Sequence, residues 1–386
     1  MAIHYAEKYA PVIDEAFTHL PLTSTLVNHN FDWLGVKTVK VFSLTTKDLA
    51  DYNIAGGSTR FGTPSDMDDA VQEMLIARDR GFAFTLDKIN AESGAGAKQA
   101  GAQLNQQIRE KIIPEIDKYR VFKALYGVDS DNLGSTALNT SANNAYDMFL
   151  AGQAALDEAA VPRDGRVSLV SPTFYRYLKQ DDSFIKSSEI AQDMLIKGQI
   201  GLVDGVAIIM APQSIIGNNY FLIGHPQALV GVEKIVDYRG HIDPPGISGT
   251  LLEGRVVYDA FMLNAKTKGF YFATKAFTVA ASAGADSTHS VIAITADFDL
   301  SLAYAAGMKI YYLSQTAAGS TAFAIGEDVA LRTGEAAVEL ASFTGNTFIA
   351  TTATTNKIAV GLCRVVGTEA ICVATADLVV AKVSGE

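Results

Sequence analysis

The chain has 386 residues, of which 48% are hydrophobic, and it carries 31 basic and 42 acidic side chains for a formal charge of −11. A length about twice that of a usual domain predicts two or more hydrophobic cores, and the acidic balance argues against a dedicated nucleic-acid binder. The longest apolar run, residues 206–211, is too short to cross a bilayer, and charged residues lie where a signal peptide would be apolar. We therefore expect no membrane contact and assembly in the cytoplasm.

The first 92 residues contain little that would build a core. Residues 1–35 have sparse apolar clusters, which is typical of an extended arm lying on other protein. Residues 36–92 begin with a predicted strand, 36–44, and return with another, 81–89, around a glycine-rich apex. Because a two-stranded excursion is marginal by itself, it should rest on a neighbouring surface. The candidate contact residues are Gly56, Gly57, Arg60, Phe61 and Trp33.

The apex sequence GSTRFGT has the glycine spacing of a phosphate-binding loop. It lacks the lysine of that motif, because Phe61 stands before Gly62. We therefore interpret it as a hairpin tip and not as a nucleotide site.

Residues 93–140 contain the strongest helical pattern, which predicts a long helix over residues 97–126. Pro114 removes the hydrogen bond to the carbonyl of Glu110, so we expect a bend there, and Gly127 is a stop signal. The predicted inward stripe consists of Leu104, Ile108, Ile112, Ile116, Tyr119, Phe122 and Leu125.

Residues 141–276 alternate between helices and short β-branched strands, which indicates an α+β domain. A helix is predicted over 141–160, with Tyr146, Phe149, Leu150 and Leu156 facing inward. In the next helix Ser171 should be the cap and Pro172 the first helical residue. The predicted strands are 166–170, 206–210, 220–223 and 256–263.

Residues 277–386 differ in composition, since all ten prolines lie at or before Pro245 and both cysteines lie after residue 276. Short alternating runs predict an all-β sandwich or barrel, and we expect a discrete module whose removal leaves the remaining fold intact. A hairpin that turns at Gly367 and Thr368 would place Cys363 opposite Cys372. We expect these cysteines to be reduced packing residues, and a cross-strand disulfide is the alternative.

No motif in the chain predicts catalysis. The six histidines, His4, His19, His29, His225, His241 and His289, lack the spacing of a metal site, and no nucleophile elbow, zinc-protease or dinucleotide-binding motif occurs. We therefore expect no catalytic, cofactor-binding or metal-binding residues, and no enzyme activity.

The ordered punctuation of residues 161–272 is similar to that of one family. It runs -GR-strand-SP-helix-, then -DGV-strand-, then -GR-strand-YD-. This order resembles the axial domain of tailed-bacteriophage major capsid proteins of the Hong Kong 97 fold, and the resemblance covers residues 1–276. It implies an N-terminal arm (1–35), an extended loop (36–92), a spine helix with the peripheral domain (93–140) and an axial domain with return strands (141–276). The C-terminal domain (277–386) would then lie on the capsid exterior.

The resemblance also implies the function and the partners. The chain would assemble with itself into hexamers and pentamers of an icosahedral shell around double-stranded DNA, which it would bind weakly and without sequence specificity. A portal protein would occupy one vertex. Because the arm begins close to Met1, a separate scaffolding protein is implied. The protein would be part of the virion.

Several alternatives remain open at this stage. An encapsulin-like bacterial compartment shares the fold, a β-rich adhesin or carbohydrate-binding protein would account for the C-terminal strands, and an enzyme would need clustered titratable groups. Capsid proteins of this fold can also form isopeptide crosslinks from a loop lysine. Nothing singles one lysine out, so we interpret the loop lysines as solvated or salt-bridged, namely Lys37, Lys40, Lys47 and Lys88.

Overall fold

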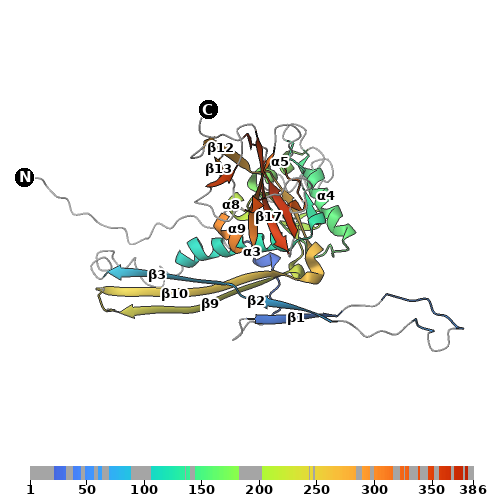
Figure 1. Ribbon diagram of the computed structural model, residues 1–386. Coiled ribbons are helices and arrows are strands. Elements are labelled where there is room, and N and C mark those ends of the chain that lie inside the picture. Colours follow the sequence, from blue (N-terminus) through green and yellow to red (C-terminus); the bar gives the residue numbers. More distant parts are fainter. Residues whose placement is uncertain are drawn as a thin grey trace, which may run out of the picture.

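The computed structural model describes residues 21–31, 38–44, 48–55, 60–62, 69–87, 106–134, 136–139, 144–181, 202–242, 244–246, 248–283, 289–295, 300–315, 322–325, 327–329, 338–339, 347–351, 356–366, 369–376 and 379–380. It is a mixed α and β structure in which an elongated sheet lies beneath a larger body (Figure 1). The α+β class predicted from the sequence is confirmed.

The elongated sheet consists of three antiparallel strands in the order β3-β10-β9. Helix α3 lies along this sheet (Figure 1), and the rings of Tyr119 in α3 and Tyr258 in β10 meet edge to face at 5.4 Å. A β-bulge between Arg255 and Val256 shifts the register of β10 against β9. The strands are β3 (Arg78–Asp87), β9 (Leu229–Ile242) and β10 (Gly249–Met262), and the helix is α3 (Ile113–Gly127).

The strands of the excursion pair differently from the prediction. Strand β1 (Thr38–Leu44) pairs with β2 (Asp69–Leu75), which the sequence analysis did not predict, and Thr38 lies opposite Leu75. Strand β3, the predicted return strand, pairs with β10 instead. The expected pairing of 36–44 with 81–89 is therefore wrong, because β3 has a far longer partner in β10.

The spine helix has a π-helical turn, Ile108–Ile112, directly before α3. Pro114 has no N–H to donate, and a wider turn is one way in which a helix accommodates a missing bond. The predicted end at Gly127 is confirmed. Within the stripe, Ile116, Tyr119, Phe122 and Leu125 are buried, Ile108 and Ile112 are half-buried, and Leu104 lies outside the described residues.

A mixed six-stranded sheet in the order β4-β11-β8-β5-β7-β6 forms much of the body. Helices α4 (Ala145–Glu158) and α5 (Pro172–Gln180) pack on it, and the rings of Phe174 and Phe221 lie 4.6 Å apart. The strands are β4 (Leu133–Gly134), β5 (Val167–Val170), β6 (Leu202–Val203), β7 (Val206–Met210), β8 (Asn219–Gly224) and β11 (Phe270–Thr274). The short helices are η1 (Ser24–Leu26), η4 (Ser130–Asn132), α8 (Gln213–Ile216), η5 (Pro226–Ala228) and η6 (Asn264–Gly269).

Most local predictions for this part hold, but β10 begins at Gly249 and not at the predicted residue 256, and one inward residue differs. Ser171 caps α5, since its hydroxyl accepts a hydrogen bond from the Phe174 N–H at 3.3 Å, and Pro172 is the first helical residue. Leu150 was expected to face inward but is exposed, because the buried face of α4 follows Met148, Phe149 and Leu156.

The described residues of 277–386 form two small sheets, but they are not all-β, because helix α9 (Leu300–Ala305) lies among the strands. Gly361 and its neighbours in β17 pair with β14 on one side and β18 on the other. The strands are β12 (Thr278–Ala283), β13 (His289–Thr295), β14 (Met308–Gln315), β15 (Val338–Glu339), β16 (Thr347–Thr351), β17 (Lys357–Val366), β18 (Glu369–Thr375) and β19 (Val379–Val380).

The predicted hairpin register near the C-terminus is confirmed. Val366 lies opposite Glu369, and Cys363 lies opposite Cys372. Both cysteines are free and fully buried, and burial raises the pKa of the Cys363 thiol well above its ordinary value.

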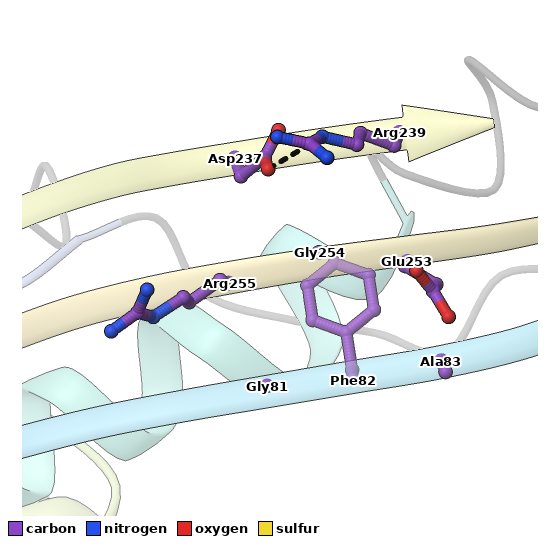
Figure 2. A pocket seen from close by; sticks show the side chains of 8 residues that line it. All are labelled: Gly81, Phe82, Ala83, Asp237, Arg239, Glu253, Gly254 and Arg255. Carbon is purple, nitrogen blue, oxygen red and sulfur yellow. Dashed lines mark ion pairs between the residues drawn. The ribbon is translucent and has the colours of Figure 1, made fainter.

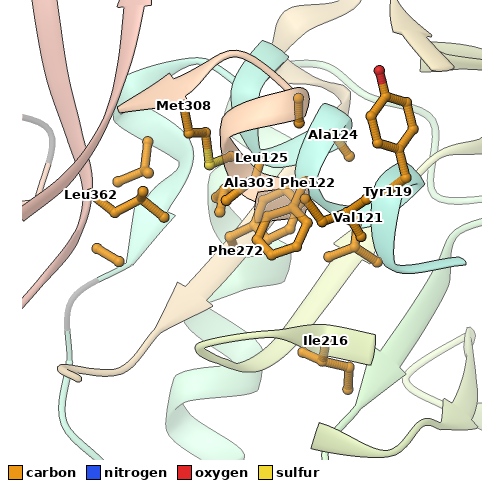
Figure 3. Close-up of a cluster of buried hydrophobic side chains, with 14 of the residues drawn as sticks. Tyr119, Val121, Phe122, Ala124, Leu125, Ile216, Phe272, Ala303, Met308 and Leu362 are labelled. Carbon is orange, nitrogen blue, oxygen red and sulfur yellow. The ribbon is translucent and has the colours of Figure 1, made fainter. Parts of the chain in front are cut away.

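The C-terminal strands share a hydrophobic core with the spine helix. Phe122 and Leu125 of α3 lie in one buried cluster with Ala303 of α9, Met308 of β14 and Leu362 of β17 (Figure 3). The compositional break near residue 276 is therefore not a boundary between two separate cores.

A short segment before β1 is anchored to α3 by buried charges. Asp117 and Arg120 are 1% and 2% exposed. The Asp117 carboxylate accepts hydrogen bonds from the Thr23 hydroxyl at 2.5 Å and the Thr23 N–H at 3.2 Å. Arg120 donates to the same hydroxyl at 3.3 Å and to Glu233 at 3.0 Å. The described part of the predicted arm is thus attached to its own subunit.

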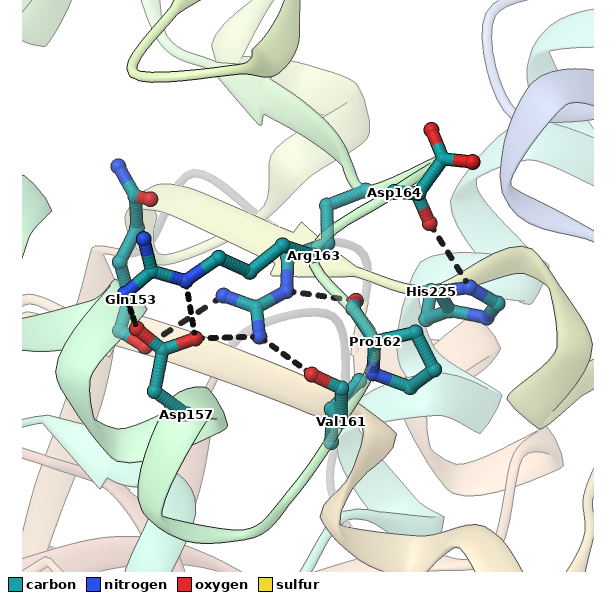
Figure 4. Close-up of polar contacts among 8 residues, drawn as sticks. Gln153, Asp157, Val161, Pro162, Arg163, Asp164 and His225 are labelled. Atoms are coloured by element: carbon teal, nitrogen blue, oxygen red, sulfur yellow. Dashed lines mark hydrogen bonds and ion pairs between the residues drawn. The ribbon is translucent and has the colours of Figure 1, made fainter.

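A buried arginine holds the end of α4 against the entry to β5 (Figure 4). The Arg166 side chain is fully buried and donates to the Asp157 carboxylate at 2.7 Å, the Val161 carbonyl at 2.6 Å and the Pro162 carbonyl at 3.0 Å. Arg163, which is largely exposed, pairs with the same carboxylate. The turn between α4 and β5 is therefore fixed by one buried charge.

This cluster predicts a contribution to acid stability. The hydrogen bonds from Arg163 and Arg166 lower the pKa of Asp157 below its ordinary value of 3.8. A lowered folded-state pKa stabilises the fold above the unfolded-state pKa, and the contribution is lost as the pH falls through the folded value. We expect the free energy of unfolding of the Asp157→Asn variant to fall less steeply than that of the wild type below pH 3.8. Urea unfolding across a pH series tests this, and equal slopes would contradict it.

Candidate inter-subunit surface

Large exposed hydrophobic side chains of the described residues concentrate on the β1–β2 excursion. Phe42 and Val71 lie directly opposite each other across the hairpin, and both are exposed. The tip carries more, and the set is Phe42, Leu49, Tyr52, Ile54, Phe61, Val71 and Leu75. A concentration of exposed apolar side chains of this kind is typical of a protein interaction site.

The tip has a defined geometry despite its exposure. The Asn53 N–H donates to the Arg60 carbonyl at 3.0 Å, and the rings of Tyr52 and Phe61 meet edge to face at 4.9 Å. Leu49 is 102% exposed and Phe61 is 85% exposed. The loop therefore presents apolar side chains to solvent on a closed turn.

The structure places only some of the predicted contact residues. Arg60 and Phe61 lie together at the tip. Gly56, Gly57 and Trp33 lie outside the described residues, as do three of the loop lysines, Lys37, Lys47 and Lys88. Lys40 is an exposed residue of β1.

The base of the excursion is held by its own subunit. Met74 of β2 is fully buried in a cluster with Val230 and Leu263. The Gln72 amide donates to the Met262 carbonyl at 2.7 Å. The sequence analysis missed β2, although the alternation of Gln72 and Met74 inward with Val71 and Leu75 outward is the period of a strand.

The far half of the elongated sheet carries a shallow hollow of about 420 Å³ (Figure 2). The Phe82 ring lies over Gly254, where an added Cβ would come within 2.3 Å of the ring. Charged pairs border it, with Asp237 and Arg239 at 2.7 Å. Both edge strands, β3 and β9, lack a further partner among the described strands. This surface therefore presents the backbone groups of two edge strands and charged side chains for contacts with another molecule.

The titratable groups with the clearest shifts have structural causes. Burial and a 2.5 Å hydrogen bond to Glu115 raise the pKa of Tyr258 to about 12, so the phenol stays protonated. Burial and the nearby Asp259 raise the pKa of Tyr119 as well. In the part of the chain that the structure describes, no group of three or more His, Cys, Asp or Glu could hold a metal ion, and no helix is long and apolar enough to cross a membrane.

No protein-family model matches the chain, and a comparison with curated proteins found no match. Solved structures do match. One is from Mycobacterium phage Che8, with 19% identity, 70% of this chain and 96% of that chain covered, and a TM-score of 0.54. The capsid structure of cyanophage P-SCSP1u matches with 16% identity, 70% and 93% coverage, and a TM-score of 0.53. The mature capsid of bacteriophage PhiM1 matches with 11% identity, 70% and 92% coverage, and a TM-score of 0.51.

These matches span nearly the whole length of each phage chain and leave part of this chain uncovered. The sequence identities are low, so what they establish is the arrangement of the backbone. The chain has the fold of tailed-bacteriophage major capsid proteins.

Proposed function

We propose that this chain is the major capsid protein of a tailed bacteriophage and that it assembles into the hexamers and pentamers of an icosahedral shell. The observation that carries the proposal is the match to phage capsid structures over more than nine-tenths of their chains. The exposed apolar excursion supports it, because a surface of this kind requires a partner. The role is structural, without enzyme activity.

The proposed division of the chain follows the fold. The arm, extended loop and spine helix make inter-subunit contacts, and residues 141–276 form the axial domain. The matches cover 70% of this chain, which is about the share that residues 1–276 represent. Residues 277–386 are then an addition to the shared fold, and we propose that they face the capsid exterior.

The further partners belong to the same proposal. A scaffolding protein acts during assembly in the host cytoplasm, a portal occupies one vertex, and double-stranded DNA fills the shell. The net charge of −11 fits a wall that encloses DNA without gripping it. The capsid matches favour this function over an encapsulin-like compartment or an adhesin.

Apolar side chains at the tip should be needed for assembly and not for folding. We expect Ile54→Asp with Phe61→Asp to lower the yield of shells at least about tenfold, since losing ~1.4 kcal/mol at a contact weakens it tenfold and every subunit repeats the contact. Electron microscopy and analytical ultracentrifugation of the full chain, expressed with its scaffold where one is needed, measure this.

The matched control is Val338→Asp, which changes an exposed apolar residue of the C-terminal part. It should assemble as the wild type does, and all variants should keep the wild-type unfolding midpoint. A tip variant that made shells in full yield would exclude the tip from the contact. A wild-type chain that made no shells would contradict the proposed function itself.

A further inference from the structure

A cationic cavity of about 450 Å³ lies where β3, the spine helix and α9 meet. Strand β3 contributes Arg78 and Arg80, and one face of the helical segment contributes Lys111 and Lys118, which are two turns apart. Helix α9 closes the cavity with Ser301 and Leu302. The C-terminal addition therefore forms part of its wall.

The four cationic side chains of this cavity outnumber its two carboxylates, Glu110 and Glu115. Glu115 is engaged by Arg80 at 3.0 Å and by Arg78 at 3.6 Å. Lys111 and Lys118 form no ion pair with any residue that the structure describes. The Arg78 Nε is buried without a hydrogen-bond acceptor. Among the described residues the cavity thus carries an excess of positive charge.

A smaller hollow of about 140 Å³ with a mixed polar and apolar lining adjoins the cavity and shares Arg80, Lys111 and Glu115 with it. Phe82 and Ile112 line it, together with Val256 and Tyr258. A ligand that filled both hollows would need acidic groups next to an apolar side chain.

The tip of the excursion has this chemistry. Asp48 and Asp51 are exposed and form no ion pair with described residues. Leu49 stands between them and is 102% exposed, and Tyr52 follows. The tip carboxylates thus complement the charge of the cavity ammonium groups, and neither set has an ion-pair partner among the described residues.

We propose that residues 48–52 of one copy dock into this cavity of a second copy, with Asp48 and Asp51 at Lys111 and Lys118, and Leu49 on the apolar side chains of the smaller hollow. The tip does not reach the cavity of its own chain, because the β1–β2 hairpin leaves the body on the side opposite to β3 and the beginning of α3 (Figure 1). This inference rests on the proposed function and identifies the receiving surface of the excursion.

Charge reversal tests the contact. Either Asp48→Lys with Asp51→Lys, or Lys111→Glu with Lys118→Glu, should lower the yield of shells at least about tenfold, because each places like charges together. All four changes in one chain should restore the yield to within about threefold of the wild type, since opposite charges meet again. Lys179→Glu on α5 is the matched control and should assemble normally.

A crosslink gives a second measurement on the assembled shells. Asp51→Cys with Lys118→Cys should form covalent oligomers on oxidation, whereas Asp51→Cys with Lys179→Cys should not, and the native cysteines are buried. Both outcomes together support the docking.

Three results would overturn the docking and leave the proposed function standing. They are a wild-type yield of shells from either charge-reversed variant, no rescue in the combined variant, and no crosslink in the Asp51→Cys, Lys118→Cys variant. The shell yield of the wild type is also measured in buffer without phosphate. If it fell as much as the yield of the cavity variant does, the cavity would be assigned to a free anion instead, and this result too would overturn the docking. Failure of the wild type to form shells is the distinct result that ends the proposed function.

Discussion

A chain that ends at residue 276 is expected to lose its cooperative fold. The truncation removes the partners of Phe122 and Leu125 on α3, which share a buried cluster with Ala303, Met308 and Leu362. Exposing each fully buried side chain of this size costs about 1.5–3 kcal/mol, and a domain has only about 5–15 kcal/mol in total. We expect an aggregated chain or one without a sharp urea transition, measured by circular dichroism and by the soluble fraction.

The control for the truncation removes one contact across the same junction. The Tyr126 hydroxyl donates to the Val365 carbonyl at 2.9 Å, and Tyr126→Phe deletes this bond at a cost of about 1 kcal/mol. This variant should unfold cooperatively with a slightly lower midpoint. A soluble truncated chain with a sharp transition would show that the C-terminal part is the discrete module that its composition first predicted.

Replacing Arg166 by alanine should destabilise the chain more than any other single charge change near α4. Arg166 is fully buried, so its loss leaves the Val161 and Pro162 carbonyls without this donor, and the Asp157 carboxylate keeps only Arg163. A hydrogen bond to a charged group contributes about 1.5–3 kcal/mol, and this substitution removes several of them. Urea unfolding of the full chain measures this as a lower midpoint with an unchanged slope.

Arg163→Ala is the matched control, because Arg163 pairs with the same Asp157 carboxylate but is 77% exposed. Its removal should leave the unfolding midpoint close to that of the wild type, since exposed ion pairs contribute little. If the two variants were equally stable, the anchoring role of Arg166 would be disproved. Burial would then not explain a difference between the two arginines in their contribution to the free energy of unfolding.

Features set by neighbouring residues were predictable. The cap at Ser171 needs only a hydroxyl three residues before an N–H. The pairing of Cys363 with Cys372 followed from a turn at residues 367–368. Each of these depends on a few adjacent dihedral angles, which local residue types decide.

The candidate contact surface was predictable only in part. The glycine-rich apex marked the tip, and Arg60 and Phe61 lie there. Strand β2 was missed because its charged residues hide the alternation that buries Met74. The cationic cavity was not foreseen, since Arg80, Lys118 and Ser301 are far apart along the chain and meet only when three elements pack.

The sequence by itself determined the class of the fold, the main helices and strands, and the resemblance to a capsid protein, because these depend on local periodicity and ordered punctuation. Only the tertiary structure decided that β3 pairs with β10, that α9 lies among the C-terminal strands, and that α3 shares its core with residues beyond 276. The physical reason is that pairing and burial between distant segments are chosen by the total apolar surface removed from water, and no local pattern records which distant partner removes the most.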